Sequence, residues 1–310
     1  MSDPHLPFDR SLLRQRRARA AATLYADADF LFEEAAHRMA ERLTDVRRDF
    51  NRVLELGARR AALANALPRN PDRLYVASDA AFTFAAHHEY GVVADDEALP
   101  FAADSFDLVL ANLNLHHVND LPGTLWQIQQ VLQPDGFFQA VMFGGETLNE
   151  LRACLVEAET EITGGAYPRF SPLADLRQIA GLLQRAGFAL PVADHERLAV
   201  RYAEPMRLLA ELRAMGESNL RHDRSRKPLR RDVLFRAMEL YQTRFGGSDG
   251  RVPASFDLVF MAGWCPDASQ PKPLRPGTAG TRLADALGTT EHKTQDVVAP
   301  PTQTRQSDGD

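Results

Sequence analysis

The sequence predicts an α/β fold in which helices cover both faces of a mostly parallel sheet. From residue 52 onward, short apolar segments alternate with helical segments, the pattern of strands joined by crossover helices. Of the 310 residues, 45% are hydrophobic and 25% are charged, which is enough apolar material for one large core. Ligands of such sheets bind beyond the carboxyl ends of the strands, so function is sought in the residues that follow each strand.

Seven segments have the length and composition of strands. They are residues 52–57, 73–77, 91–94, 106–110, 137–142, 196–202 and 255–262. Helices are predicted between and beside them, at residues 61–67, 80–89, 121–132, 147–161 and 173–186. The fifty residues between the last two strands, 203–252, are too long for a turn, and we expect a helical insertion there.

The flanking segments complete a three-part organisation. Residues 1–50 should form N-terminal helices, 51–267 a single domain, and 268–310, rich in Pro, Gly and Thr, a disordered tail. The helix at 10–22 is dense in arginine. We interpret it as a basic surface helix with a solvated face, and docking against an acidic partner is the alternative.

Composition excludes several classes of function. A net charge of -6 gives no overall attraction to nucleic acid or to anionic lipid. The two cysteines, Cys154 and Cys265, lie far apart and outside any CxxC, so neither a disulfide framework nor a zinc site is expected. No apolar run is long enough to span a bilayer, and Met1–Asp9 lacks a secretory pattern, so we expect a cytoplasmic protein without integral membrane segments.

Polar residues follow four of the predicted strands and form the candidate cofactor site. A carboxylate after the second strand can accept hydrogen bonds from both ribose hydroxyls of a nucleotide cofactor. A carboxylate after the third strand can accept a hydrogen bond from an adenine amino group. Glycine after the first strand lets the backbone approach the ligand closely. The candidate cofactor-binding residues are Glu55, Gly57, Asp79, Asp95, Asp96 and Asn112.

These residues, in this order, resemble the class I S-adenosylmethionine (SAM) methyltransferases of the type 11 group, over roughly residues 50–145. Leu99-Pro-Phe and Leu132-Gln-Pro-Asp-Gly136 are typical of that group. The resemblance implies a Rossmann-like fold and SAM as cofactor. A dinucleotide-binding domain is disfavoured because GxGxxG is absent after the first strand. The chain departs from the methyltransferase pattern at Arg59 and Ala61, where that pattern has glycines.

Other stretches resemble a narrower family, that of the respiratory complex I assembly factor known as an arginine hydroxylase (assembly factor five). The most specific are Met142-Phe-Gly-Gly-Glu-Thr-Leu and Met215-Gly-Glu-Ser-Asn219, and the resemblance extends to about residue 265. It implies that the chain assists complex I assembly by hydroxylating an arginine of an iron–sulfur subunit, which would be its partner. Two alternatives stay open: a methyltransferase acting on a small molecule or carrier protein, and a non-catalytic assembly chaperone with a degenerate SAM loop.

Three residues are candidates for catalysis or partner binding. Glu146 and Glu217 present carboxylates that suit an arginine substrate, and His116 follows the fourth strand. Each has a structural alternative: a helix start for Glu146, a helix end or a pair with Arg213 for Glu217, and packing for His116. His87 and Glu89 have His-x-Glu spacing, but side chains two apart on a helix diverge, so no metal site is expected.

Overall fold

The computed structural model describes residues 6–22, 28–271 and 283–289. The chain divides into two units, Met1–Ser269 and Gln270–Asp310. In the second unit the described residues include the four-residue helix α10 (Leu283–Ala286). The predicted disordered tail falls largely outside the described residues.

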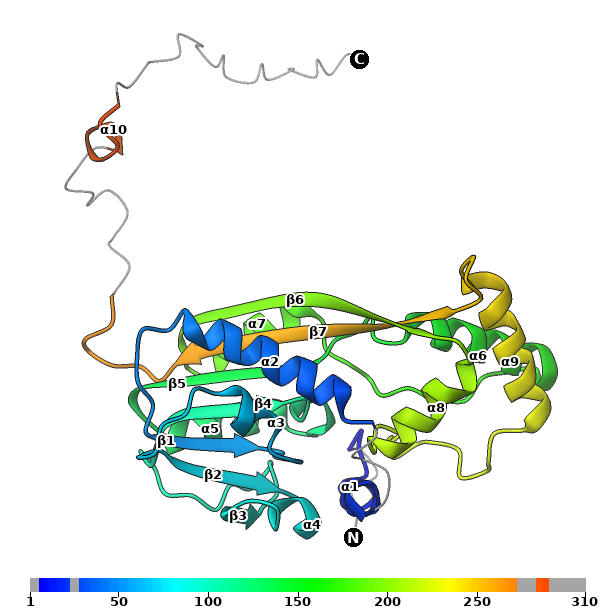
Figure 1. Ribbon diagram of the computed structural model, residues 1–310, viewed down its shortest axis with the longest axis horizontal. Helices are drawn as coiled ribbons and strands as arrows, with labels where there is room; N and C mark the ends of the chain where they lie inside the picture. The colour runs from blue at the N-terminus through cyan, green and yellow to red at the C-terminus, as the bar shows by residue number, and fades with distance from the viewer. Residues whose placement is uncertain (1–5, 23–27, 272–282, 290–310) are drawn as a thin grey trace, which may run out of the picture. The chain divides into compact units, whose positions relative to one another are not determined.

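A seven-stranded sheet organises the first unit, in the order β3-β2-β1-β4-β5-β7-β6 (Figure 1). Its first five strands run parallel, and β7 is antiparallel to both β5 and β6. The strands are β1 (Arg52–Leu56), β2 (Leu74–Asp79), β3 (Tyr90–Val93), β4 (Phe106–Asn112), β5 (Leu132–Phe143), β6 (Ala189–Tyr202) and β7 (Val252–Trp264). The predicted mostly parallel, seven-stranded sheet is therefore confirmed.

Both faces of the sheet are covered, because side chains of a strand point alternately to opposite faces. On β4, Leu108 and Leu110 belong to the apolar cluster that contains Phe32, while Val109 and Ala111 belong to the cluster that contains Ile128. The first face packs against α2 (Phe30–Thr44), which crosses the sheet in Figure 1. The second packs against α5 (Leu121–Val131) and α7 (Leu176–Arg185).

The predicted helical insertion is present between β6 and β7. It consists of α8 (Pro205–Ala214) and α9 (Arg231–Phe245), and α9 packs against α6 (Asn149–Thr163). In Figure 1 these helices lie beyond the ends toward which the β1 and β2 arrows point. The insertion therefore lies on the side of the sheet where ligands of this fold bind.

One predicted helix is much shorter in the structure. The predicted helix 80–89 is only α4 (Phe82–Ala85), because the chain must turn to enter β3. Gly91 approaches so closely that a Cβ there would lie 1.9 Å from the Ala85 carbonyl oxygen. The other short helix on this side of the sheet, α3 (Ala62–Ala66), agrees with the prediction within a residue at each end.

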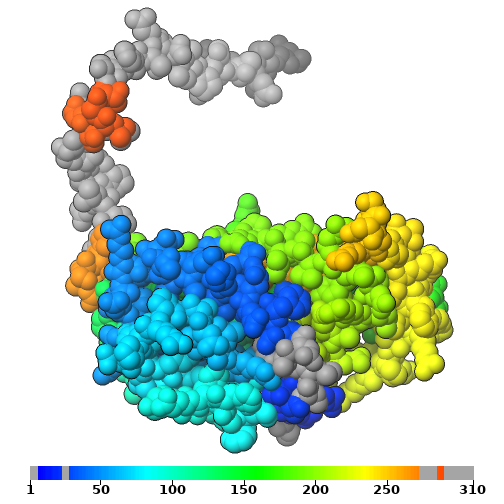
Figure 2. All heavy atoms as spheres, viewed as in Figure 1, coloured from blue at the N-terminus to red at the C-terminus, as the bar shows by residue number. Residues whose placement is uncertain are grey.

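The N-terminal helix α1 (Arg10–Ala22) is not the solvated helix that its composition suggests. Leu13, Arg17 and Ala20 are buried, and the helix packs against α4. The backbone N–H of Asp9 donates to the Leu220 carbonyl oxygen, and that of His222 donates to the Pro7 carbonyl oxygen, so the start of α1 is joined to the insertion. Figure 2 shows the resulting surface, with α1 lying between the strand-end region and the insertion. In the part of the chain that the structure describes, no helix has the length and apolar character to cross a bilayer.

Candidate functional site

The first strand ends on a carboxyl group that is fully enclosed. Glu55 is 2% exposed and its Oε2 accepts a hydrogen bond of 2.6 Å from the Tyr75 hydroxyl. Burial raises the pKa of Glu55 to about 8, so the group is mostly protonated at neutral pH. Glu55 therefore presents an uncharged carboxyl group to the site, and not a carboxylate.

The turn after β1 requires glycine for two reasons. Gly57 has φ +69°, and a Cβ at this position would lie 2.2 Å from Cγ of Asn114. Glu55, Gly57, Arg59 and Asn112 line a cavity of only about 10 Å³, roughly the space of one water molecule. The Asn112 side chain donates to the Phe32 carbonyl oxygen instead of facing an open pocket.

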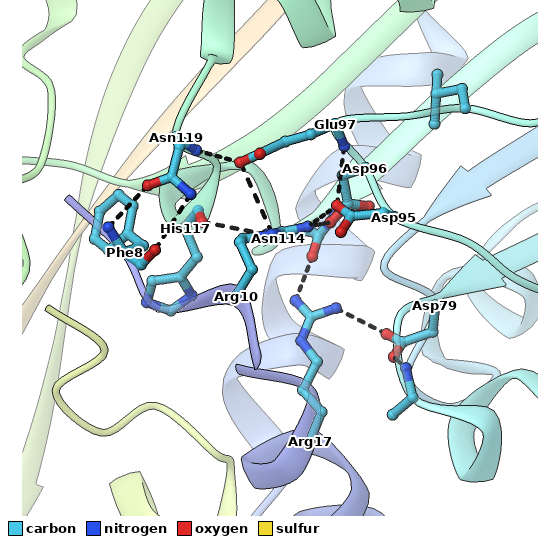
Figure 3. Close-up of polar contacts among 12 residues, drawn as sticks. Phe8, Arg10, Arg17, Asp79, Asp95, Asp96, Glu97, Asn114, His117 and Asn119 are labelled. Atoms are coloured by element: carbon cyan, nitrogen blue, oxygen red, sulfur yellow. Dashed lines mark hydrogen bonds and ion pairs between the residues drawn. The ribbon is translucent and has the colours of Figure 1, made fainter. Parts of the chain in front are cut away.

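Asp79, at the end of β2, is neutralised by the N-terminal helix (Figure 3). Its Oδ2 lies 2.9 Å from Nη1 of Arg17, and both side chains are 0% exposed. Its Oδ1 accepts from the Ala81 backbone N–H. The second Arg17 amino group donates to Asn114 Oδ1. Burial raises the pKa of Asp79 in spite of the Arg17 charge.

A second arginine of α1 holds the acids that follow β3. Nη2 of Arg10 lies 2.6 Å from Asp95 and 3.1 Å from Asp96. Burial alone would raise the pKa of Asp95, but Arg10 holds it below its usual value. Asp96 in turn accepts from Asn114 Nδ2 at 2.9 Å. We call these residues the strand-end network: Arg10, Arg17, Asp79, Asp95, Asp96 and Asn114.

The strand-end network brings predicted residues together, but it joins them to partners that the sequence reading missed. Asp79, Asp95 and Asp96 were predicted to meet a cofactor, whereas Arg10 and Arg17 hold them here. The sequence carried one signal of these contacts. Arg10 and Arg17 are seven residues apart, so they lie on one face of α1. The acidic partner of the basic helix is the chain itself.

SAM does not fit this arrangement. The atoms that would receive its ribose hydroxyls already bind Arg17 and Ala81, and the space beside Gly57 is filled by Asn114. The cavity that Gly57 lines, about 10 Å³, is far smaller than a nucleoside. SAM would need α1 to be displaced.

Arg59, which departs from the methyltransferase loop pattern, contacts α2 and the segment after α8. It is 3% exposed, lies 4.1 Å from the centre of the Phe32 ring, and donates to the Met215 carbonyl oxygen and to Glu217 Oε1. Glu217 therefore pairs with Arg59 rather than with Arg213. The residue that replaces a loop glycine anchors the start of the segment after α8.

Glu217 also meets two histidines that follow β4. His116 and His117 belong to the short 3-10 helix η2 (Leu115–His117) that follows β4. Their Nε2 atoms lie 3.3 and 3.6 Å from Glu217 Oε2. We call His116, His117 and Glu217 the His–His–Glu cluster. The expectation of no metal site overlooked it, because 101 residues separate His116 from Glu217.

The His–His–Glu cluster lies on the wall of a cavity of about 350 Å³. Most of the wall is apolar, from residues such as Phe143, Leu151 and Phe256, and it includes Arg152 and Arg169. Glu146, which was predicted to face Glu217 across this space, is exposed and accepts from the Asn149 side chain instead. The cavity is large enough for one extended side chain or a small ligand.

Comparison with known proteins decides the family. A methyltransferase-domain model, Methyltransf_11, matches residues 54–140. The arginine-hydroxylase NDUFAF5 of Danio rerio is 39% identical over 285 residues, which span 90% of this chain and 88% of the relative. Human NDUFAF5 is 38% identical over 279 residues, spanning 88% and 81%. This chain belongs to the NDUFAF5 family.

Wider relatives of the NDUFAF5 family include methyltransferases. A malonyl-[acyl-carrier protein] O-methyltransferase of Halorhodospira halophila is 35% identical over 267 residues, spanning 83% of this chain and 88% of the relative. The solved structure of YcgJ from Bacillus subtilis has a TM-score of 0.51 at 16% identity, covering 76% of this chain and 99% of YcgJ. YcgJ supports the fold alone.

The NDUFAF5 relatives also correct one expectation. Their names place them in mitochondria, which conflicts with the plain cytoplasmic location expected from the N-terminal sequence. That expectation is withdrawn.

Proposed function

We propose that this chain hydroxylates an arginine of an iron–sulfur subunit of respiratory complex I and thereby assists assembly of the complex. The observation that carries the proposal is the ion pair of Asp79 with Arg17, which occupies the carboxylate that a methyl donor would need. The 350 Å³ cavity beside the His–His–Glu cluster remains available to a substrate side chain. Four relatives named arginine-hydroxylases, at 37–39% identity over most of both chains, support the same reaction.

The reaction needs co-substrates that the twenty amino acids do not provide. Hydroxylation by dioxygen inserts one oxygen atom into a C–H bond of the arginine side chain. The other oxygen atom leaves as water, which consumes two electrons and two protons from a reductant. The proposal therefore includes dioxygen and a two-electron donor.

A second candidate is methylation of a carboxylate carried by an acyl-carrier protein. The specific observation in its favour is the pair Arg152 and Arg169 on the cavity wall, since guanidinium groups bind carboxylates well. Arg169 already pairs with Glu159, however, and Arg152 donates to backbone carbonyls of Gly145 and Thr147. Methylation would also require α1 to leave Asp79.

Mass spectrometry of a co-produced partner distinguishes these functions. The full chain and a complex I iron–sulfur subunit are produced together in a bacterium that lacks its own homologue, and the subunit is digested. Hydroxylation adds one oxygen atom to an arginine peptide of the subunit. A malonyl-acyl-carrier protein produced with the chain in the same way gains one methylene on its carboxylate if the second candidate is correct. A subunit that co-purifies without hydroxylation would instead support the non-catalytic chaperone.

Variants of Glu217 sharpen this experiment. Glu217→Gln should abolish the modification, whereas Glu161→Gln, which alters an exposed carboxylate paired with Arg236, should leave it intact. Thermal unfolding of both variants is measured alongside, because Glu217 also holds Arg59. Full modification by a stably folded Glu217→Gln protein would remove Glu217 from the site.

A further inference from the structure

The His–His–Glu cluster combines three side chains that bind metals and that come from separate parts of the chain. His116 and His117 follow β4, and Glu217 follows α8. Their side chains are 1%, 4% and 7% exposed, and one ligand atom from each lies within 4.8 Å of the other two. Surface carboxylates gather by chance, but two buried imidazoles facing one buried carboxylate oxygen are a specific arrangement.

The two oxygens of the Glu217 carboxylate have different partners. Arg59 binds Oε1 of this carboxylate, so Oε2 faces the histidines as a single ligand oxygen.

The distances are close to those of a coordination sphere. Ligands about 2.1 Å from an ion and at right angles to one another lie about 3 Å apart. The Nε2 atoms of His116 and His117 lie 3.3 and 3.6 Å from Glu217 Oε2, so each histidine–carboxylate distance is within several tenths of an ångström of that spacing. All three residues line the 350 Å³ cavity, which leaves room for further ligands on that side.

We propose that His116, His117 and Glu217 bind a divalent transition-metal ion, with Fe(II) as the native ion. Two histidines and one carboxylate with open positions are the ligand set of non-haem iron oxygenases. The choice of iron rests on the proposed hydroxylation, since iron with open positions can bind dioxygen, whereas the binding site itself rests on geometry. The ion would lie where the proposed substrate cavity meets the sheet.

Two features should limit the affinity. The charge of Arg59 opposes a cation beside Glu217. The Nδ1 atoms of His116 and His117 have no hydrogen-bond partner among the described residues, whereas metal-bound histidines generally donate from their second nitrogen. We therefore expect weaker binding than in sites with a complete second shell, and titrations must reach well above micromolar ion concentrations.

Metal titration of the full chain tests the site without any substrate. The chelator-treated protein is titrated with Co(II), whose visible spectrum reports its ligands, and with Fe(II) in the absence of oxygen. Wild-type protein should bind one equivalent. His116→Gln and His117→Gln should weaken binding by about 100-fold. The control is His37→Gln, which alters an exposed histidine of α2 and should bind like the wild type.

Thermal unfolding keeps the test decisive if a ligand variant folds poorly. A metal that binds only the folded state raises the unfolding temperature as its concentration rises. Wild type and His37→Gln should show this rise, and His117→Gln should not. Equal rises in wild type and His117→Gln, or no Co(II) spectrum in the wild type, would overturn the metal site.

These outcomes separate the metal site from the proposed function. A chain that binds the ion without hydroxylating its partner would retain the site and contradict the proposed reaction. A chelator-treated chain that still hydroxylates an arginine, with no ion detected, would retain the reaction and contradict the site.

Discussion

The strand-end network and the His–His–Glu cluster are adjacent polar regions that differ in how their charges are satisfied. In the first, Arg10 and Arg17 of α1 bind the carboxylates that would bind a nucleotide. In the second, Glu217 shares its oxygens between Arg59 and two histidines on the wall of an open cavity. The comparison shows that internal ion pairs fill the strand-end region, whereas the neighbouring cavity has space for a ligand.

The largest effect should come from breaking the buried ion pair between Arg17 and Asp79 in the strand-end network. Arg17→Met should lower the free energy of unfolding by about 3–5 kcal/mol, because it leaves the fully buried Asp79 without its ion-pair partner. Urea denaturation measures the change. The double variant Arg17→Met/Asp79→Asn should recover most of it, since no charge then stays buried unpaired. A loss below about 1 kcal/mol in the single variant would contradict the tight closure.

The next effect concerns how folding stability depends on pH through the uncharged carboxyl group of Glu55. Its pKa of about 8, against a usual 4.5, means that the folded chain keeps this proton to higher pH than the unfolded chain. Folding stability from this group therefore falls as pH rises from about 4.5 to about 8. Glu55→Gln should remove that fall, on the order of a few kcal/mol. Urea denaturation across this range, compared with wild type, measures it; parallel curves would contradict the raised pKa.

A third prediction asks which feature excludes SAM. Restoring the loop with Arg59→Gly/Ala61→Gly should leave SAM binding undetectable by isothermal titration, because Arg17 still occupies Asp79. S-adenosylhomocysteine serves as a second ligand. Saturable binding by the loop variant would assign the exclusion to Arg59 instead of to α1.

The smallest effect is expected at the surface and serves as the reference for the others. Arg236→Gln breaks an exposed ion pair with Glu161, 2.8 Å apart, and solvent screens such pairs. The urea midpoint should stay unchanged within error. A measurable fall in the midpoint would show that exposed ion pairs stabilise this chain as well as buried ones. The difference expected between Arg236 and Arg17 would then be contradicted.

The sequence alone determined the sheet and its coverings, because these follow from local periodicity. Alternating apolar segments marked all seven strands, and the length of 203–252 marked the insertion. It also placed Asp79, Asp95 and Gly57 at strand ends, where the fold gathers ligand groups. These are short-range properties, set by which residues follow which.

Only the tertiary structure decided what those groups contact. Arg17 reaches Asp79 across 62 residues, and Arg59 reaches Glu217 across 158. The seven-residue spacing of Arg10 and Arg17 puts them on one face of α1, but no local pattern tells whether that face meets solvent or a carboxylate cluster, because the difference depends on where the helix packs. The sequence therefore supplied the charged groups of both sites. The packing of α1 and of the insertion decided which site is filled by ion pairs and which has a cavity. The physical reason is that a buried charged group without a partner costs much free energy, so each buried charge must find one.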